Sequence, residues 1–521
     1  MPKNISNEIV DLVKSLTKAE KRYFKLYASM GNVNEDAIYI HLFNYMDSTK
    51  KYSDEKALQK IPNAKHRQLS NQKRYLYELL VESLTLFHAG KSVDSRLRLL
   101  LNEIELLYSK ALFKQTAQTI NRAKILARRY EKYNHLSALN ILESKLLFEN
   151  LSDKGWEAEA NKLSEEGIII GEKIKTLAQF RKLYAQLVKL NRSSGLMPEK
   201  ESILKAKKIL KHQSLDRRNI PQIFNERLYY YTIQAQCYFI FRNWEKCYYY
   251  YDHILTDFER HPYFKDDLAQ QYISSLGKAM QACIILRKES TLESNFNKVR
   301  SLIQSHSSSR NSHIMGNLLT SIIPMLTYYC DSGEFHKGIK LIEQIKDMIA
   351  IHHKSIRKNT EIIFYYNFAC MYFGASEYRR SLTWVNKILN ENWGDVRSDL
   401  QQFCSLFYLM IHFEIGNTNE LGYFAKSTHR ALMKREKKYK LETSLVDFFR
   451  TILPKVNSKK ERVAVFIKLR SNFMQLKKDK DERIALDYFD FISWIDSKIE
   501  NRSVADIAKE KWKMGVPFTS N

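Results

Sequence analysis

One stripe along a predicted helix would present five basic side chains, at positions i, i+4, i+8, i+11 and i+12: Lys426, Arg430, Lys434, Lys437 and Lys438. The opposite side of that helix would pack on the preceding helix, because it carries Leu421, Phe424, Ala425, Thr428 and Leu432. A solvated basic stripe attracts phosphates, acidic protein segments or an anionic lipid surface. The chemistry that these residues support is therefore binding.

The charge of the whole chain points the same way. It has 84 Lys+Arg against 58 Asp+Glu, a formal net charge of +26, and a pI near 9.5. Residues 421–480 contain 17 basic and 5 acidic side chains, so these 60 positions carry +12, nearly half of the net charge. We expect this region to meet an acidic protein or peptide, with nucleic acid as the alternative partner, unless it is only a solvated lysine-rich face.

Tyrosines clustered in two runs, residues 229–231 and 248–251, are the candidates for apolar contacts with a partner. No helix buries all of its sides, so some of these rings must face outward, and an exposed tyrosine in a groove can anchor a peptide. The candidate groove aromatics are Tyr229, Tyr230, Tyr248 and Tyr249.

Enzyme motifs are missing from the sequence, each for want of a physical requirement. No glycine-rich loop can bring backbone N–H groups to a phosphate, no G-x-S-x-G turn presents a serine, and no H-E-x-x-H pairs two histidines on one helical turn. We therefore expect a protein that is not an enzyme, with no catalytic residues, no cofactor and no metal ligands.

Helices must position all of these residues, as composition and periodicity indicate. With only 15 Gly and 8 Pro in 521 residues, the chain has too few turn residues for a many-stranded fold. Apolar residues recur at spacings of three and four in nearly every window, which predicts an all-α protein. A first helix is announced by Thr17 and Glu20, whose spacing is that of a capping box.

Pairs of helices follow from about residue 92 and show a weak repeat. An aromatic residue near the end of one helix precedes a small residue in the next by nine positions in four places: Tyr108 with Ala117, Tyr238 with Cys247, Tyr329 with Gly338, and Tyr372 with Ser381. A small residue is needed where two helices cross closely. The spacing resembles the tetratricopeptide repeat, best in the copy Tyr365, Ala369, Tyr372, Ser381, Val385 and Ile388, although Tyr329 to Tyr372 exceeds its usual ~34-residue period.

This degenerate TPR-like pattern implies an α-solenoid of antiparallel helical hairpins with helical caps at both ends. We expect an N-terminal helical cap over residues 1–90, the repeat array over 91–455, and a C-terminal helical cap and tail over 456–521, with helices at 459–478 and 482–500. The segment Leu16 to Tyr27 is similar to the opening of a group of uncharacterised bacterial helical-repeat proteins, a likeness that implies no activity.

The N-terminal unit supports a rival interpretation as a DNA-binding helix-turn-helix. The helix predicted at 54–60 would be its first helix, and His66, Arg67, Lys73 and Arg74 would make the second one basic. The intervening loop, Ile61 to Lys65, is longer than the usual turn, and leucines run along most of the second helix. A structural cap is the preferred interpretation, and a nucleic-acid-binding regulator stays as the alternative.

Compartment follows from the N-terminus and the cysteines. Residues 1–8 lack the apolar core of a secretory signal, and the longest apolar stretch, Cys404 to Phe413, is about half of the roughly 20 residues that span a membrane. The six cysteines are far apart, which suits buried free thiols in a reducing cytoplasm. We expect a cytoplasmic, non-enzymatic scaffold or adaptor for a protein or peptide, and the sequence leaves its oligomeric state open.

Overall fold

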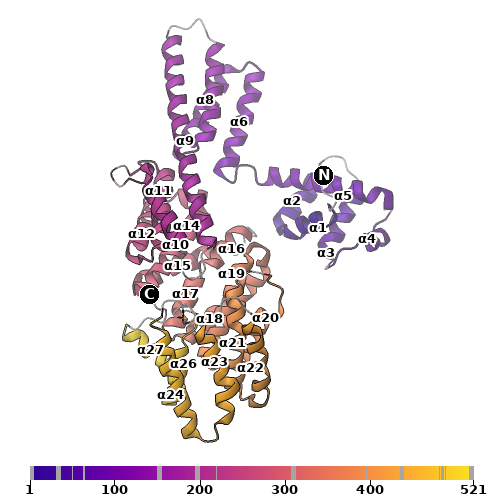
Figure 1. The fold of residues 1–521 in the computed structure, drawn as a ribbon. Helices are drawn as coiled ribbons and strands as arrows, with labels where there is room; N and C mark the ends of the chain where they lie inside the picture. Colours follow the sequence, from indigo (N-terminus) through magenta and orange to yellow (C-terminus); the bar gives the residue numbers. More distant parts are fainter. Residues whose placement is uncertain are drawn as a thin grey trace. The chain divides into compact units, whose positions relative to one another are not determined.

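The computed structural model describes residues 5–30, 37–49, 51–62, 65–149, 155–193, 200–216, 218, 220–306, 312–394, 396–434, 439–479, 482, 486 and 488–515. Every described element is a helix, so the expected all-α class is confirmed (Figure 1). The chain divides into two compact units. Unit 1 comprises Met1–Arg181, Gln222–Glu226 and His306–Arg310, and unit 2 comprises Lys182–Pro221, Arg227–Ser305 and Asn311–Asn521.

Unit 1 contains two hydrophobic clusters formed by consecutive helices. The first cluster is built by α1 (Ile5–Ser15), α2 (Lys18–Ser29), α3 (Ile38–Ser48), α4 (Asp54–Lys60) and α5 (His66–Phe87). The second is built by α6 (Val93–Ser109), α7 (Phe113–Arg129), α8 (Tyr133–Phe148) and the unit 1 part of the long α9 (Trp156–Ser193). The predicted capping box is present at the start of α2, where the Glu20 N–H donates to Thr17 Oγ1 over 3.1 Å. Helix α1, which precedes it, was not predicted.

Unit 2 is a succession of paired helices. Its elements are α10 (Lys200–Leu210), η1 (Gln213–Leu215), α11 (Phe224–Ile240), α12 (Trp244–Arg260), α13 (Phe264–Asp267), α14 (Ala269–Ile285), α15 (Glu289–His306), α16 (Ser312–Thr320), α17 (Ile323–Asp331), α18 (Phe335–Ile351), η2 (His353–Ser355), α19 (Lys358–Gly374), α20 (Tyr378–Asn390), α21 (Ser398–Ile415), α22 (Thr418–Met433), α23 (Lys440–Asp447), η3 (Phe448–Ile452), η4 (Leu453–Lys455), α24 (Lys459–Leu476), α26 (Phe491–Glu500) and α27 (Val504–Lys513). Helices that follow one another in the chain contact each other. The first helices of successive pairs are also in contact: α17 contacts α19, and α19 contacts α21. The protein is thus a helical-repeat-like array of packed helices.

A turn that contains a left-handed residue joins the two helices of five pairs in unit 2. Its key residue lies in the left-handed region of backbone conformation, and these residues recur every 40 to 46 positions: Arg242, Arg287, Gly333, Ser376 and Gly416. At Ser376, the N–H of the next residue, Glu377, donates to the carbonyl of Tyr372 over 2.8 Å, which is the Schellman helix ending. The repeat unit is therefore longer than the tetratricopeptide consensus, as the tyrosine spacing predicted.

Small residues lie at the close helix crossings in three of the four predicted places. Cys247, Gly338 and Ser381 are buried, and the Ser381 hydroxyl donates to the Ala369 carbonyl over 2.8 Å. The prediction was wrong for Ala117, which is exposed on α7, because the buried position is its neighbour Thr116. One residue on a helix rotates a side chain by about 100°, enough to exchange the core face for solvent.

The predicted helix at 482–500 is interrupted just before its midpoint, and its second half forms α26. Tyr488 and Phe489 form a bend, and α26 begins only after Asp490, whose carboxylate accepts a hydrogen bond from the Ser493 N–H over 2.9 Å. The bend places both rings into the aromatic core: Tyr488 stacks on Phe403 with ring centroids 5.3 Å apart, and Phe489 lies 5.1 Å from Phe407. A continuous helix could not aim two consecutive side chains at one face.

Residues 488–513, which we call the C-terminal segment, contact four successive helix pairs of unit 2. Trp494 on α26 donates to the Glu414 carboxylate of α21 over 2.6 Å. Trp512 on α27 donates to Glu289 of α15 over 2.7 Å, and its ring lies under the Arg287 guanidinium at 3.2 Å. Between these ends, the segment packs on α19 and on the turn after α17. It therefore ties together helix pairs that are far apart in the sequence.

Candidate functional site

Of the basic stripe predicted on residues 426–438, Lys426 and Arg430 lie on the exposed side of α22, and Lys434 caps its C-terminal end. Lys426, Arg430 and Lys434 are all exposed, whereas Lys437 and Lys438 lie outside the described residues. The other side of the helix is held against unit 2 by Leu421, Ala425 and Leu432, which are buried, and by Phe424, whose ring centroid lies 5.2 Å from that of Tyr408. The apolar residues thus fix the orientation that turns the basic ones outward.

An exposed aromatic residue that the sequence analysis did not single out completes this face. Tyr423 is 68% exposed and precedes Lys426 and Arg430 by three and seven positions, so the three side chains share one side of α22. Among the described residues, neither Lys426 nor Arg430 nor Lys434 forms an ion pair. We call Tyr423, Lys426, Arg430 and Lys434 the α22 face. It combines a ring and cationic groups that have no acidic partner in the described part of the chain.

The four candidate groove tyrosines do not form one surface. Tyr230 of α11 is 1% exposed, so it cannot contact a partner unless the protein unfolds there. Tyr229 lies half-buried against Tyr184, and Tyr248 is held by the Lys288 ammonium, 3.9 Å from its ring. Only Tyr249, at 53% exposure, presents most of its ring to solvent. Tyr229 and Tyr230 belong to α11, Tyr248 and Tyr249 belong to α12, and within each pair the two side chains differ in exposure.

One of the basic residues in the N-terminal unit, Lys73, is buried and forms an ion pair within the fold. Lys73 is 5% exposed, and its ammonium donates to both carboxylate oxygens of Asp54 over 2.6 and 2.7 Å. It therefore joins α5 to α4 and cannot reach a nucleic-acid phosphate. Arg74 is exposed but pairs with Glu78 at 2.9 Å.

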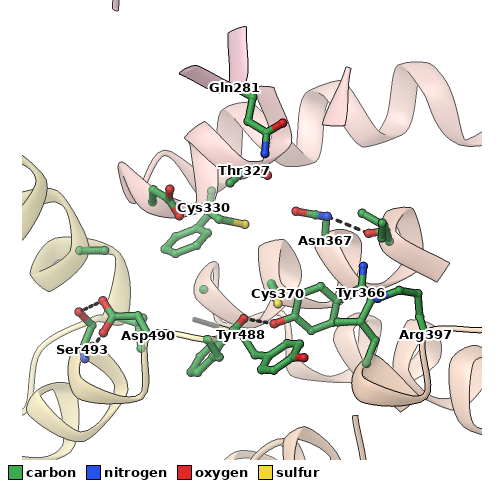
Figure 2. A pocket seen from close by; sticks show the side chains of 18 residues that line it. Gln281, Thr327, Cys330, Tyr366, Asn367, Cys370, Arg397, Tyr488, Asp490 and Ser493 are labelled. Carbon is green, nitrogen blue, oxygen red and sulfur yellow. Dashed lines mark hydrogen bonds between the residues drawn. The ribbon is translucent and has the colours of Figure 1, made fainter. Parts of the chain in front are cut away.

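A cavity of about 300 Å³ lies inside unit 2, between the helix pairs and the C-terminal segment (Figure 2). Gln281 of α14 and Cys330 of α17 line it from one side, and Tyr366, Asn367 and Cys370 line it from α19. The bend at Tyr488–Asp490 and helix α27 complete its wall. The C-terminal segment is thus part of this cavity.

Two of the charged groups at the cavity are already paired. Arg397 forms two bonds with the Asp399 carboxylate, of 2.8 Å from Nε and 2.7 Å from Nη2, and Asp399 also accepts from the Tyr488 hydroxyl over 2.8 Å. Asp490 is occupied by Ser493, which donates to it from its N–H and its hydroxyl. Neither group has to find a partner in the cavity.

Asp331 is the exception. It is 9% exposed, and its buried Oδ1 has no hydrogen-bond partner among the described residues. The pKa of Asp331 is raised to about 8, mainly by burial and also by the negative charge of Asp490, while the cationic Arg287 opposes both. The position at the end of α17 adds a helix C-terminus, where a negative charge is unfavourable. The carboxyl group is therefore held protonated at neutral pH unless a cation joins it.

The six thiols have raised pKa values, which lowers their reactivity as nucleophiles. All six cysteines are free, and burial raises the pKa of each, to about 12 for Cys370. Nucleophilic attack needs the thiolate, so none is poised for catalysis. No group of three or more His, Cys, Asp or Glu side chains in the described part of the chain could hold a metal ion. No described helix is long and apolar enough to cross a membrane.

Comparisons with known proteins give no family. No protein-family model, no curated protein and no solved structure matches the chain. The functional interpretation therefore rests on the surfaces and the cavity of the chain itself.

Proposed function

We propose that the protein is a non-enzymatic scaffold or adaptor, a TPR-like α-solenoid that binds an acidic protein segment through the α22 face. The single observation that carries the proposal is the exposed ring of Tyr423 beside Lys426 and Arg430, which have no ion pair among the described residues. Exposed Tyr and Arg side chains contribute most to protein interfaces, because they combine apolar area with directional hydrogen bonds.

The C-terminal segment supports this mode of binding by example. It holds to the helix pairs through aromatic anchors such as Trp494, each tied down by a hydrogen bond to a carboxylate at the end of a repeat helix. An acidic segment could be held at α22 in a similar way, with Tyr423 as the aromatic group and Lys426 and Arg430 as donors to its carboxylates. Lysine and arginine would then speed association and orient the partner, and the tyrosine would supply apolar contact.

Pull-down from a native lysate with the purified protein, with and without nuclease, tests the proposal. The variants are Tyr423→Ala and the triple change Lys426→Glu, Arg430→Glu and Lys434→Glu. The matched control is the triple change Lys207→Glu, Lys208→Glu and Lys211→Glu. These lysines are exposed on and just after α10, and their replacement changes the net charge by the same amount. A protein retained after nuclease, released by both α22 variants and kept by the control, is the expected result.

The alternative function is a nucleic-acid-binding regulator that uses the basic 421–480 region or the N-terminal helical unit. Nucleic acid that co-purifies and is lost on nuclease treatment would favour it. Its affinity would fall by orders of magnitude between low and high salt, because each phosphate contact releases a counterion. An interface anchored by Tyr423 would lose much less over the same range.

A further inference from the structure

We propose that the cavity of unit 2 is a binding site for a small organic cation, an amine with an apolar body, whose ammonium group pairs with Asp331. This site is separate from the α22 face, because no residue of α22 lines the cavity. About 300 Å³ is at the lower end of the range of small-molecule pockets, so the ligand is small.

The charge of the ligand follows from the polar groups in the wall. Arg397 is neutralised by Asp399 and Asp490 is capped by Ser493, so the charged group of the lining that has an oxygen without a partner among the described residues is Asp331. An ammonium carries only donors, and the carboxylate of Asp331, which lines the cavity, can accept one of them once it is ionised. An anion would meet the carboxylate of Asp490 in the wall, and the one cationic group of the lining, Arg397, is already paired with Asp399.

The body of the ligand follows from the rest of the lining. Phe335 and Phe489 supply apolar surface, and the ring of Tyr366 stands in the wall with its hydroxyl donated to the Tyr488 carbonyl. Aromatic faces attract cations as well as apolar groups. The amide of Asn367 donates to the Ile363 carbonyl over 2.8 Å, which leaves its oxygen to accept from the ligand.

An occupied cavity would be expected to strengthen the C-terminal segment. The wall takes Asp331 from α17 and Asn367 from α19, but Phe489 and Ala508 from the C-terminal segment. A ligand that touches both sides binds only when the segment is in place, so it stabilises that arrangement.

The probes are 2-phenylethylamine, its neutral analogue 2-phenylethanol and the anion 3-phenylpropionate, titrated into the full-length protein by calorimetry at pH 7. We expect the amine to bind at least tenfold more tightly than the alcohol and the anion not to bind. Asp331→Asn should weaken the amine by tenfold or more and leave the alcohol unchanged. The control Asp347→Asn removes an exposed carboxylate of α18 and should change nothing.

A second variant keeps the test independent of the charge. Ala508→Leu fills the cavity from α27 and should abolish binding of both the amine and the alcohol, with Asp331 intact. Hydrogen exchange of residues 488–513 should slow when the amine is added to wild type. Equal affinities of the amine and the alcohol, amine binding that survives Asp331→Asn, or no binding of any probe to the folded protein would each overturn the proposal.

Discussion

The backbones of Gly333 and Lys509 lie in direct contact, although 176 positions separate them in the sequence. A Cβ atom on Gly333 would lie 2.8 Å from the Lys509 nitrogen and 2.8 Å from the Ala505 carbonyl oxygen. Gly333 also has φ near +71°, in the turn between α17 and α18. The turn of one helix pair thus forms the seat for α27, and only glycine meets both demands.

Gly333→Ala should therefore loosen the C-terminal segment as well as strain the turn. Gly416→Ala is the matched control, because Gly416 has φ near +89° but no atom within 4 Å of its Cβ position. We expect the control to lose about 1 to 2 kcal/mol of unfolding free energy from the left-handed conformation alone. The Gly333 variant should lose more, because backbone atoms would have to move apart.

Urea unfolding followed by tryptophan fluorescence measures these losses, since Trp244, Trp384, Trp393, Trp494 and Trp512 all belong to unit 2. Limited proteolysis should in addition cut residues 488–513 faster in Gly333→Ala than in Gly416→Ala. Equal losses of stability and equal cleavage rates would mean that the contact with α27 contributes nothing.

Gly338 and Gly422 give a second matched pair, both within helices. A Cβ on Gly338 would lie 2.2 Å from Sδ and Cε of Met371, which is fully buried in α19, whereas Gly422 of α22 has nothing within 4 Å. Gly338→Ala should cost about 1 to 3 kcal/mol through overpacking. Gly422→Ala should gain up to about 1 kcal/mol, because alanine is the better helix former.

Thermal and urea unfolding of the two variants check this prediction. The double variant Gly338→Ala with Met371→Ala should recover part of the steric loss relative to the sum of the single changes, as expected for residues in contact. Additive effects of the two changes would contradict a crossing held by Gly338 and Met371.

The sequence anticipated the helices and most of the close crossings for a physical reason. Helical periodicity and the nine-residue spacing are local signals, and they located the buried Cys247, Gly338 and Ser381. The same signal failed at Ala117, because its neighbour Thr116 takes the buried position. Spacing alone cannot choose between two adjacent small residues.

The candidate surface was predicted only in part. The basic stripe was visible because Lys426, Arg430 and Lys434 share a helical face, but Tyr423 escaped notice because it stands alone rather than in a run of tyrosines. Four of the seven tyrosines in the two runs are buried, Tyr230 among them, and only Tyr249 is exposed. A ring one turn before a basic stripe is the signal that would have found Tyr423.

The cavity could not have been predicted, because its wall is not local in the sequence. Its lining extends from Gln281 to Ala508 and depends on the bend at Tyr488, which periodicity did not reveal. Asp331 looks in the sequence like a solvated carboxylate near a helix end. Its surroundings in the folded chain include residues of the distant C-terminal segment, such as Phe489 and Ala508, which line the same cavity.

The raised pKa of Asp331 gives unit 2 a specific pH dependence. In the folded protein this carboxyl group titrates near pH 8, against about 4 in the unfolded chain. The folded state therefore holds one more proton between these values, and stability that is fully present below about pH 4 is lost as pH rises to about 8. The slope from this group is at most about 1.4 kcal/mol per pH unit.

Unfolding free energies of wild type and Asp331→Asn, measured in urea from pH 5 to pH 9, check this dependence. Titrations shared by both proteins cancel in the difference, so wild type should lose stability relative to the variant as pH rises and level off above about pH 8. Asp490 and Arg287 stay in place in both proteins. A difference that does not change with pH would show that Asp331 is already ionised at pH 5.

The cysteines should resist alkylation in the folded protein. Burial raises the pKa of Cys237 and Cys247 to about 12 and that of Cys283 to about 11, so their thiolate fraction near pH 8 is about 100-fold or more below that of an ordinary thiol. Iodoacetamide labelling followed by mass spectrometry, with glutathione as the rate standard, measures each site.

Cys330 and Cys370 should react first, because they line the cavity and a small reagent can reach them when the C-terminal segment moves. All six should react within minutes in urea, and rapid labelling of Cys237 in the native protein would contradict the packing of α11.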